Sequence, residues 1–234
     1  MNKTIVVTGG TKGIGRAIIN LFADKGFNII TCARSKADLE GLKVELLAKR
    51  DDIFFEGIDV DLSQKNDVDK FIAFALTHSA DLQVLVNNAG VFLPGEMHSE
   101  EDGAFEKMME TNVTSVYHII RGLIPLLINN HGHIFNMCST ASILPYANGG
   151  SYCISKYALL GMTKVLREEM KDKHVRVTAI MPGATLTASW EGTDLPEERF
   201  MKATDVAHAV WGAYALSERS VVEEILIRPQ LGDL

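Results

Sequence analysis

Cysteine, proline and aromatic residues are all scarce in this chain. Its 234 residues include three cysteines and six prolines, and Phe, Trp and Tyr together make up 7% of them. The cysteines, Cys32, Cys138 and Cys153, are odd in number and lack Cys-x-x-Cys spacing, which argues against a disulfide framework and a zinc site. No charged leader followed by a long apolar segment and a cleavage site is present, so no secretory signal is expected. We therefore predict a cytoplasmic protein with free thiols.

Long hydrophobic runs and an excess of positive charge are also missing. The most apolar stretch of the later sequence, residues 119–128, contains an arginine, a glycine and a proline and is too short to span a bilayer. The formal net charge of −7 argues against binding to nucleic acid or to anionic lipid. His131-Gly132-His133 has no third ligand at metal spacing, and we interpret it as a turn before a strand. We expect no metal site, and neither nucleic acid nor membrane as a partner.

Hydrophobic residues make up 47% of the chain, which is enough to bury one substantial core. Short β-branched apolar runs alternate with longer amphipathic stretches, the pattern of βα units on a parallel sheet. Strands are predicted at 4–8, 27–33, 53–57, 82–87, 132–138, 174–181 and 224–228, and helices at 13–25, 36–49, 64–78, 105–129, 151–172 and 204–217. We expect an α/β fold, namely one doubly wound Rossmann-type domain over residues 1–234, with a parallel sheet of about seven strands flanked by helices.

A glycine-rich turn follows the first predicted strand and leads directly into a helix. Its sequence is Thr8-Gly9-Gly10-Thr11-Lys12-Gly13-Ile14-Gly15. Glycine lets the backbone turn tightly and approach a pyrophosphate, whose charge is attracted by the unpaired N–H groups of the helix start. A plain strand–helix turn is the alternative, but the position between strand and helix favours dinucleotide binding. Because doubly wound sheets bind ligands beyond the carboxyl ends of their strands, the chemistry should lie after residues 8, 33, 87, 138 and 181.

The end of the second predicted strand indicates which dinucleotide is bound. An acidic residue there would favour NAD by accepting hydrogen bonds from the ribose hydroxyls, whereas a basic residue would pair with the 2′-phosphate of NADP. The sequence has no acid at this tip but Arg34, followed by Ser35, and Lys12 lies in the facing glycine turn. The alternative is that Arg34 and Lys12 are ordinary solvated charges. Two cations near one phosphate position favour NADP(H) as the cofactor.

Seven motifs, in the same order along the chain, resemble those of the short-chain dehydrogenase/reductase family over essentially its whole length. They are the TGxxxGxG turn at Gly9, Gly13 and Gly15, Asp59-Val60, Asn87-Asn88-Ala89-Gly90, Asn112, Ser139, Tyr152-x-x-x-Lys156, and Pro182-Gly183 with Thr187. The resemblance implies that the catalytic residues are Asn112, Ser139, Tyr152 and Lys156. It also implies cofactor contacts by Gly9, Thr11, Lys12, Gly13, Ile14, Gly15, Arg34, Ser35, Asp59, Val60, Asn88, Ala89, Gly90, Tyr152, Lys156, Pro182, Gly183, Thr185 and Thr187.

These residue types suit the reduction of a carbonyl group, which needs a hydride on carbon and a proton on oxygen. Tyr152 and Lys156 are four residues apart, so on a helix their side chains share a face and the ammonium group would stabilise a tyrosine phenolate. Ser139 can hydrogen-bond the carbonyl oxygen; Thr140 and Ser142 are alternative hydroxyls, but Ser139 has the family's register. The resemblance further implies that Asn112 helps to hold a water that links Lys156 to solvent.

Candidate substrate contacts are Ser139, Tyr146, Trp190 and Asp233. The C-terminal segment with Asp233, and Trp190 after the threonine motif, resemble bacterial sepiapterin reductases, which use NADPH to reduce a side-chain ketone of a pterin. Trp190 either closes over a flat ring or packs against the last helix. The expected function is therefore NADPH-dependent reduction of a small carbonyl substrate, first of all a pterin ketone, with Tyr152 as proton donor.

Two other functions remain open from the sequence. A reductase of 3-oxoacyl thioesters or other small ketones is the alternative among enzymes, and a non-catalytic dinucleotide sensor is the alternative from another class. Family members often form dimers or tetramers through two long helices that match residues 105–129 and 151–172 here. The resemblance therefore also implies a homo-dimer or homo-tetramer.

Overall fold

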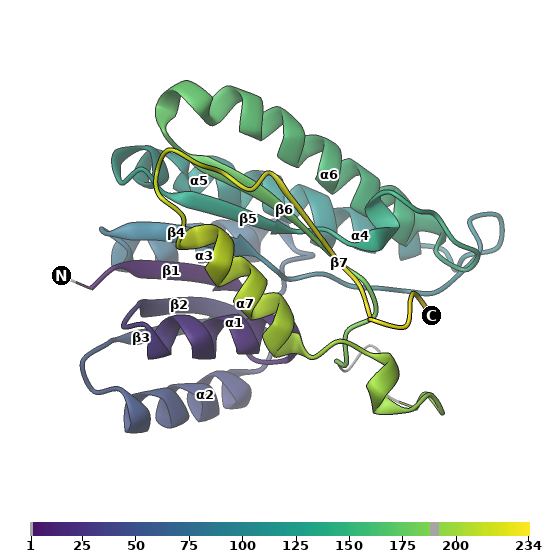
Figure 1. The fold of residues 1–234 in the computed structure, drawn as a ribbon, viewed down its shortest axis with the longest axis horizontal. Helices are drawn as coiled ribbons and strands as arrows, with labels where there is room; N and C mark the ends of the chain where they lie inside the picture. The colour runs from purple at the N-terminus through teal and green to yellow at the C-terminus, as the bar shows by residue number, and fades with distance from the viewer. Residues whose placement is uncertain (1, 188–191) are drawn as a thin grey trace.

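A seven-stranded sheet is the centre of the molecule in the computed structural model, which describes residues 2–187 and 192–234 (Figure 1). Its strands are β1 (Thr4–Thr8), β2 (Asn28–Ala33), β3 (Phe55–Asp59), β4 (Leu82–Asn87), β5 (His133–Met137), β6 (Arg176–Pro182) and β7 (Glu224–Ile227). They lie in the order β3-β2-β1-β4-β5-β6-β7, and every neighbouring pair is parallel. This is the doubly wound topology, so the predicted α/β fold is confirmed.

Helices cover both faces of the sheet. They are α1 (Gly13–Asp24), α2 (Lys36–Lys49), α3 (Lys65–His78), α4 (Ala104–Met109), α5 (Ser115–Asn129), α6 (Gly150–Met170) and α7 (Ala203–Tyr214). One buried cluster joins α3, α5 and α6 to the sheet, and another joins α1, α2 and α7 to the opposite face (Figure 1). Strands covered on both faces are apolar on both faces, as in β1, where all five residues of Thr-Ile-Val-Val-Thr are buried.

The helix predicted over residues 105–129 is interrupted near its start. α4 ends at Met109, a π-helical turn follows over Glu110–Thr114, and α5 begins at Ser115. The buried Asn112 lies in this wider turn, and its side chain hydrogen-bonds the backbone of Val91. A π turn shifts one residue out of the regular helical register, and here it directs Asn112 toward the segment that follows β4.

Several strand boundaries also differ from those predicted, and two strand starts differ by two residues. β3 begins at Phe55 rather than at residue 53. β6 begins at Arg176 rather than at residue 174, because a 3₁₀ turn over Lys171–Lys173 and a left-handed His174, with φ of 58°, complete the exit from α6. These turns reverse the chain before it re-enters the sheet.

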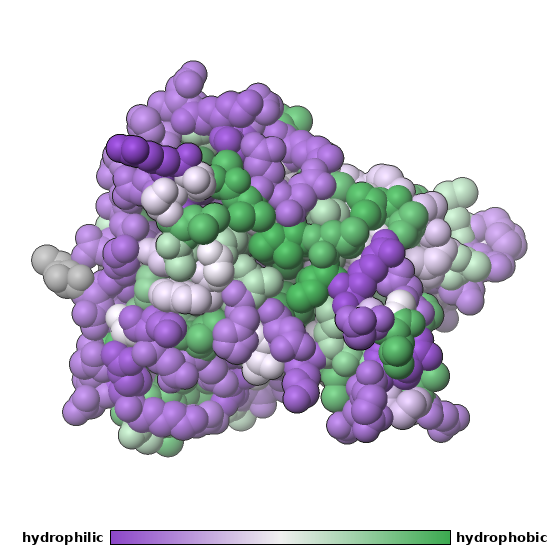
Figure 2. Space-filling view, viewed as in Figure 1, coloured by the Kyte–Doolittle hydropathy of each residue, from purple (hydrophilic) through white to green (hydrophobic). Residues whose placement is uncertain are grey.

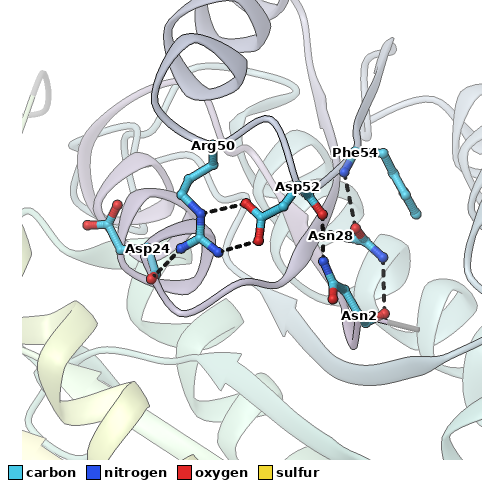
Figure 3. A network of polar contacts seen from close by, with 6 residues as sticks. All are labelled: Asn2, Asp24, Asn28, Arg50, Asp52 and Phe54. Carbon is cyan, nitrogen blue, oxygen red and sulfur yellow. Dashed lines mark hydrogen bonds and ion pairs between the residues drawn. The ribbon is translucent and has the colours of Figure 1, made fainter.

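The amino ends of β1 and β2 are closed by a network of polar contacts (Figure 3). Arg50 donates from Nε to Asp52 Oδ1 at 2.7 Å, from Nη2 to Asp52 Oδ2 at 2.8 Å and from Nη1 to the carbonyl of Asp24 at 2.7 Å. Hydrogen bonding to Arg50 lowers the pKa of the Asp52 carboxyl. Asn2 donates to the carbonyl of Asp52, and Asn28 joins Asn2 to the amide of Phe54. The network ties the start of the sheet to the turn before β3.

The surface carries an apolar band at one edge of the sheet. Figure 2 shows this band crossing a mostly hydrophilic face where Figure 1 draws β6 and β7. β7 is the outer strand of the sheet, and Leu226 on it is 48% exposed. Among the described residues, no helix has the length and apolar character needed to cross a membrane.

Candidate active site

A cavity of about 720 Å³ lies at the carboxyl ends of the central strands, the edge where the sequence placed the chemistry. Most of the sequence-predicted site residues line it: Gly9, Thr11, Lys12, Gly13, Ile14, Arg34, Val60, Asn88, Ala89, Gly90, Ser139, Tyr146, Tyr152, Lys156, Pro182, Gly183, Thr185, Thr187 and Asp233. Four others, Gly15, Ser35, Asp59 and Asn112, are outside this lining. Trp190 lies outside the described residues.

The glycine turn after β1 has the backbone that its sequence predicts. Gly9 has φ of 67° and Gly13 has φ of 54°, both in the left-handed region that favours glycine. Gly9 N and Gly10 N donate to the carbonyl of Cys32 at the end of β2. Gly15 lies in α1 behind the turn, and no side chain fits there, because a Cβ would lie 2.4 Å from the carbonyl oxygen of Gly9. Gly15 lets α1 pack against the turn. The cofactor contact that the sequence assigned to it stays a prediction.

The loop after β4 is fastened to this turn through Thr8. The Thr8 hydroxyl accepts from the amides of Asn88 at 3.0 Å and Ala89 at 2.9 Å. The Asn88 side chain in turn donates to the carbonyls of Thr8 and Gly9, at 3.0 and 3.1 Å. These hydrogen bonds hold the glycine turn and the loop after β4 together along one wall of the cavity.

Two cations stand at the end of the cavity near β2. Arg34 is exposed and lines the cavity directly after β2. Lys12 lines it from the glycine turn, and its Nζ lies 3.2 Å from Asp38 Oδ2 in the first turn of α2. Ser35 does not line the cavity because its side chain caps α2, accepting from the amide of Asp38 at 3.2 Å. Its role in this structure is to fix the start of α2 beside the two cations.

The loop after β3 contributes Val60, Asp61 and Leu62 to the cavity wall. Asp59, which the sequence assigned there, is exposed at the last position of β3 and is absent from the lining. Asp61 was missed, although a second acid two residues further on was visible in the sequence. Its amide donates to Asp67 of α3, and its carboxylate accepts from Ser63.

Tyr152 and Lys156 lie one turn apart on α6 and face the cavity together. The Lys156 Nζ is 5.6 Å from the centroid of the Tyr152 ring. Lys156 is only 5% exposed, and its Nζ donates to the carbonyl of Met137 at the end of β5, at 2.8 Å. Phe92, which the sequence reasoning missed, packs its ring edge-on against Tyr152 with centroids 4.9 Å apart.

Ser139 is placed by a short turn that follows β5. Its Oγ accepts from the amide of Ala141 at 3.1 Å, while Ser142 Oγ accepts from the amide of Ser139 at 3.2 Å. This reciprocal capping fixes the Ser139 side chain. Because a hydroxyl has one proton to donate, and the oxygen is used here as an acceptor, the Ser139 proton is free to be donated into the cavity.

Asn112 lies behind the cavity wall rather than in it. Its Oδ1 accepts from Val91 N at 2.8 Å, and its Nδ2 donates to Val91 O and to Ser155 Oγ, both at 3.0 Å. Ser155 passes the link on by donating to the carbonyl of Tyr152 at 2.8 Å. Asn112 thus joins the loop after β4 to the first turn of α6.

The two thiols nearest the cavity are buried. Burial raises the pKa of Cys32 to about 12 and that of Cys138 to about 11. Both stay protonated near neutral pH and act as small packing groups.

The remaining wall combines three segments that are distant in the sequence. Gly183 N, after β6, donates to the carbonyl of Ile227 at 2.8 Å, and a Cβ on Gly183 would lie 3.3 Å from Asp233 Oδ1. Asp233 is held by Arg228, whose Nη1 is 3.4 Å from its carboxylate. Tyr146 lines the same cavity from the loop before α6, and its pKa is raised by burial and then by the neighbouring Tyr152. Tyr146 is therefore a neutral hydrogen-bond donor.

One cavity is lined by a glycine turn suited to binding an anion, by the hydroxyls of Ser139 and Tyr152, and by the buried ammonium group of Lys156. Such a site can hold an elongated phosphate-bearing cofactor and deliver a proton beside its far end. No group of three or more His, Cys, Asp or Glu side chains within the described ranges is arranged to hold a metal ion.

Comparison with known proteins agrees with this geometry. The sequence matches the family model of the short chain dehydrogenases over residues 3–197. Sepiapterin reductase of Chlorobaculum tepidum is 31% identical over 243 residues, which cover 100% of this chain and 99% of the relative.

Two solved structures share the fold over nearly the whole chain. The alcohol dehydrogenase of the archaeon Thermococcus sibiricus, complexed with 5-hydroxy-NADP, is 26% identical with a TM-score of 0.89, covering 98% of this chain and 97% of that one. L-sorbose reductase of Gluconobacter frateurii, complexed with NADPH and L-sorbose, is 25% identical with a TM-score of 0.89, covering 97% and 95%. This chain therefore belongs to the short-chain dehydrogenase family and is an oxidoreductase.

Proposed function

We propose that this chain reduces a small carbonyl compound with NADPH and that Tyr152 supplies the proton. The observation that carries the proposal is that Ser139, Tyr152 and Lys156 line the same cavity as the glycine turn and Arg34. The NADPH-bound and NADP-related complexes of similar proteins support the choice of cofactor.

The residues present fit such a cofactor. The left-handed Gly9 and Gly13 leave the turn open to a pyrophosphate, and Arg34 and Lys12 offer charge to a 2′-phosphate. Pro182, Gly183 and Thr185 would border the nicotinamide at the far end. When bound, NADPH supplies a hydride to the carbonyl carbon.

The proton step follows from the positions of three side chains. Ser139 donates to the carbonyl oxygen, because its Oγ already accepts from Ala141 N and its proton is free. Tyr152 transfers its phenolic proton to the same oxygen as the alcohol forms. The buried ammonium of Lys156, fixed by the carbonyl of Met137, stabilises the phenolate left behind. Asn112 and Ser155 hold the backbone of Tyr152 in place during this transfer.

A pterin with a side-chain ketone is the substrate that we favour. The support is the full-length similarity to a sepiapterin reductase and the carboxylate of Asp233 at the cavity wall. A pterin is flat and carries N–H groups at one edge. A carboxylate can accept hydrogen bonds from these groups. The neutral Tyr146 is a donor for its ring oxygen or nitrogens. Trp190 remains a sequence-based candidate for stacking on the ring.

The test measures NADPH consumption by the purified protein with sepiapterin, a simple diketone and an acetoacetyl thioester. We expect sepiapterin to be reduced with the highest kcat/KM. Asp233→Asn should raise the KM for sepiapterin about tenfold or more, because a hydrogen bond to a charged partner is lost, while the KM for NADPH stays unchanged. Rapid reduction of the thioester without reduction of sepiapterin would identify a 3-oxoacyl reductase instead. Tight NADPH binding without any turnover would identify a dinucleotide sensor.

We also propose that the chain acts as a homo-dimer or homo-tetramer. α4, α5 and α6 carry exposed large apolar side chains, namely Phe105, Tyr117, Ile154, Tyr157 and Val165. Exposed apolar groups gathered on neighbouring helices are typical of contact surfaces. Light scattering of the purified protein measures the mass and so decides the assembly. Cytoplasmic location stays a prediction of the sequence.

A further inference from the structure

The helix that carries Tyr152 begins without a capping side chain of its own. α6 starts at Gly150, and its N-cap position is Gly149, which has no side chain to accept from the first free amides. A carboxylate from another segment takes this role. Glu100, in the loop between β4 and α4, accepts from Ser151 N through Oε1 at 2.7 Å and from Ser151 Oγ through Oε2.

The joint around Glu100 is closely packed. Gly95 N donates to the carbonyl of Asn148 at 3.0 Å, and Gly95 forms an isolated parallel bridge with Gly149. A Cβ on Gly150 would lie 2.2 Å from Glu100 Oε1 and 2.7 Å from the carbonyl oxygen of Gly95. Ser151 is only 2% exposed. The glycines thus admit the Glu100 carboxylate to the helix start, where its charge is also favourable for the helix dipole.

Both sides of this joint carry residues of the cavity. Ser151 directly precedes Tyr152. Phe92, on the same loop as Glu100, packs against the Tyr152 ring. Lys156, by contrast, is fixed one turn later by the carbonyl of Met137, a contact that does not involve Glu100. The placement of Tyr152 relative to Lys156 therefore depends on how firmly the first turn of α6 is held.

We propose that Glu100 is a positioning residue for Tyr152, which caps α6 from the loop after β4 and sets the distance between the tyrosine hydroxyl and its reaction partners. This inference rests on the proposed carbonyl reduction. The side chain at position 100 must accept a hydrogen bond from Ser151 N and form a second one with Ser151 Oγ. We therefore expect glutamine to cap the helix and alanine to leave it uncapped.

The experiment compares Glu100→Ala, Glu100→Gln and Glu101→Ala, using the carbonyl substrate that the wild type reduces fastest. Glu101 is the matched control, since it is an exposed acid on the same loop. Glu100→Ala should lower kcat about tenfold, in line with the loss of a helix cap, with the KM for NADPH within about twofold. Glu100→Gln should keep kcat within about threefold of the wild type, because Oε1 still accepts from Ser151 N and the amide can donate to Ser151 Oγ. Glu101→Ala should match the wild type.

Amide hydrogen exchange in the protein without substrate gives a readout that does not depend on turnover. In Glu100→Ala the amides of Ser151 and Tyr152 should exchange at least about tenfold faster, while the second turn of α6 stays protected. Wild-type kcat in Glu100→Ala, or an equal loss in Glu100→Gln, would overturn the proposal. So would a loss of kcat accompanied by an equal loss of NADPH binding. A wild type that reduces no carbonyl compound, but whose exchange pattern responds as described, would refute the proposed function alone.

Discussion

The hydroxyl of Tyr152 supplies the proton in the proposed reaction, and its removal should leave the fold intact. Within the described residues, this hydroxyl makes no hydrogen bond to the protein. The Tyr152 ring, by contrast, packs against Phe92. Tyr152→Phe should therefore lower kcat about 10²- to 10⁴-fold, the usual share of general acid catalysis, while NADPH binds normally. Steady-state turnover and a fluorescence titration with NADPH measure the two effects. A variant with most of the wild-type rate would contradict the assigned role.

Arg34 is the residue on which preference for NADPH over NADH should depend. It lines the cavity directly after β2 and is exposed there. Removing a charge-assisted contact to the 2′-phosphate costs about 1.5–3 kcal/mol, so Arg34→Ala should weaken NADPH binding about tenfold to a hundredfold and leave NADH binding unchanged. Dissociation constants for both cofactors measure this. Equal weakening for NADH would show that Arg34 does not contact the 2′-phosphate.

Asp38 should have the opposite effect at the same place. Its carboxylate holds Lys12, with 3.2 Å between Nζ and Oδ2, and would repel a phosphate beside that lysine. Asp38→Asn frees the lysine and should tighten NADPH binding about threefold to tenfold without changing NADH binding. Asp69→Asn, which breaks the exposed pair with Lys65 on α3, is a suitable control. No change for either cofactor would mean that Lys12 lies too far from the 2′-phosphate.

At the scale of single elements, α3 is tied to the cavity wall by Asp67. Its Oδ2 accepts from Asp61 N at 3.0 Å and its Oδ1 from Lys70 Nζ at 2.7 Å. The hydrogen bond from Asp61, and then that from Lys70, lower the pKa of Asp67. A carboxyl with a lowered pKa in the folded state contributes stability above its unfolded pKa of about 3.9, and this is lost as the pH falls through the folded value.

Asp67→Asn keeps an oxygen for the Asp61 amide but removes the charge. It should lower Tm at neutral pH, and the difference from the wild type should shrink once the pH falls below the unfolded pKa of about 3.9, as the wild-type carboxyl takes up its proton. Thermal unfolding followed by circular dichroism over this pH range tests the prediction. A difference in Tm that grows on acidification would have the wrong sign.

Element positions were largely predictable from the sequence, and the reasons are local. Strands such as β1 and β4 are mostly apolar, and the helices between them are amphipathic, so period and composition define them. The π turn around Asn112 was not predictable as a turn, because it depends on Val91, which is distant in the sequence. Ser35 and Asp59 were assigned to the site by position along the chain, whereas capping geometry and the end of β3 decide where they point.

Residues that act through contacts across the fold were the ones missed. Phe92 belongs to the site because its ring packs against Tyr152, and Glu100 because it accepts a hydrogen bond from Ser151 at the distant start of α6. Neither carries a local signal, since a phenylalanine after a valine and a glutamate in an acidic loop are ordinary. Motifs locate the reacting groups, while the contacts that hold them come from the tertiary structure.

At the scale of the whole molecule, we expect His133 to make the stability of the fold sensitive to acid. It is buried on β5, stacks on Phe135 and shares a 2.7 Å contact between Nε2 and Thr178 Oγ1. Since Thr178 donates its own proton to the carbonyl of Val222, His133 Nε2 carries the proton, and Nδ1 has no partner among the described residues. Burial, and then the charge of Arg176, lower the pKa of His133 well below its usual value.

A histidine that stays neutral in the folded state favours unfolding once the unfolded chain can protonate it. Stability should therefore fall as the pH drops below about 6.5, by up to about 1.4 kcal/mol per pH unit, until the folded pKa is reached. His133→Gln should flatten this dependence between about pH 6.5 and 5, whatever its effect at neutral pH. Urea unfolding at several pH values measures it, with the exposed His208→Gln as control. An unchanged slope in His133→Gln would place the acid sensitivity elsewhere.

The strand order has a consequence for the way the chain is made. β1 pairs with β2 on one side and with β4 on the other, so it stays an outer strand until residues 82–87 have left the ribosome. The strand Thr4–Thr8 is entirely buried in the complete fold. During synthesis it exposes unpaired N–H and C=O groups along one edge, together with apolar side chains. Such an edge is a template for pairing with another chain. A nascent or truncated product that ends before Leu82 should therefore aggregate rather than fold, and β4 is the segment whose synthesis ends that hazard.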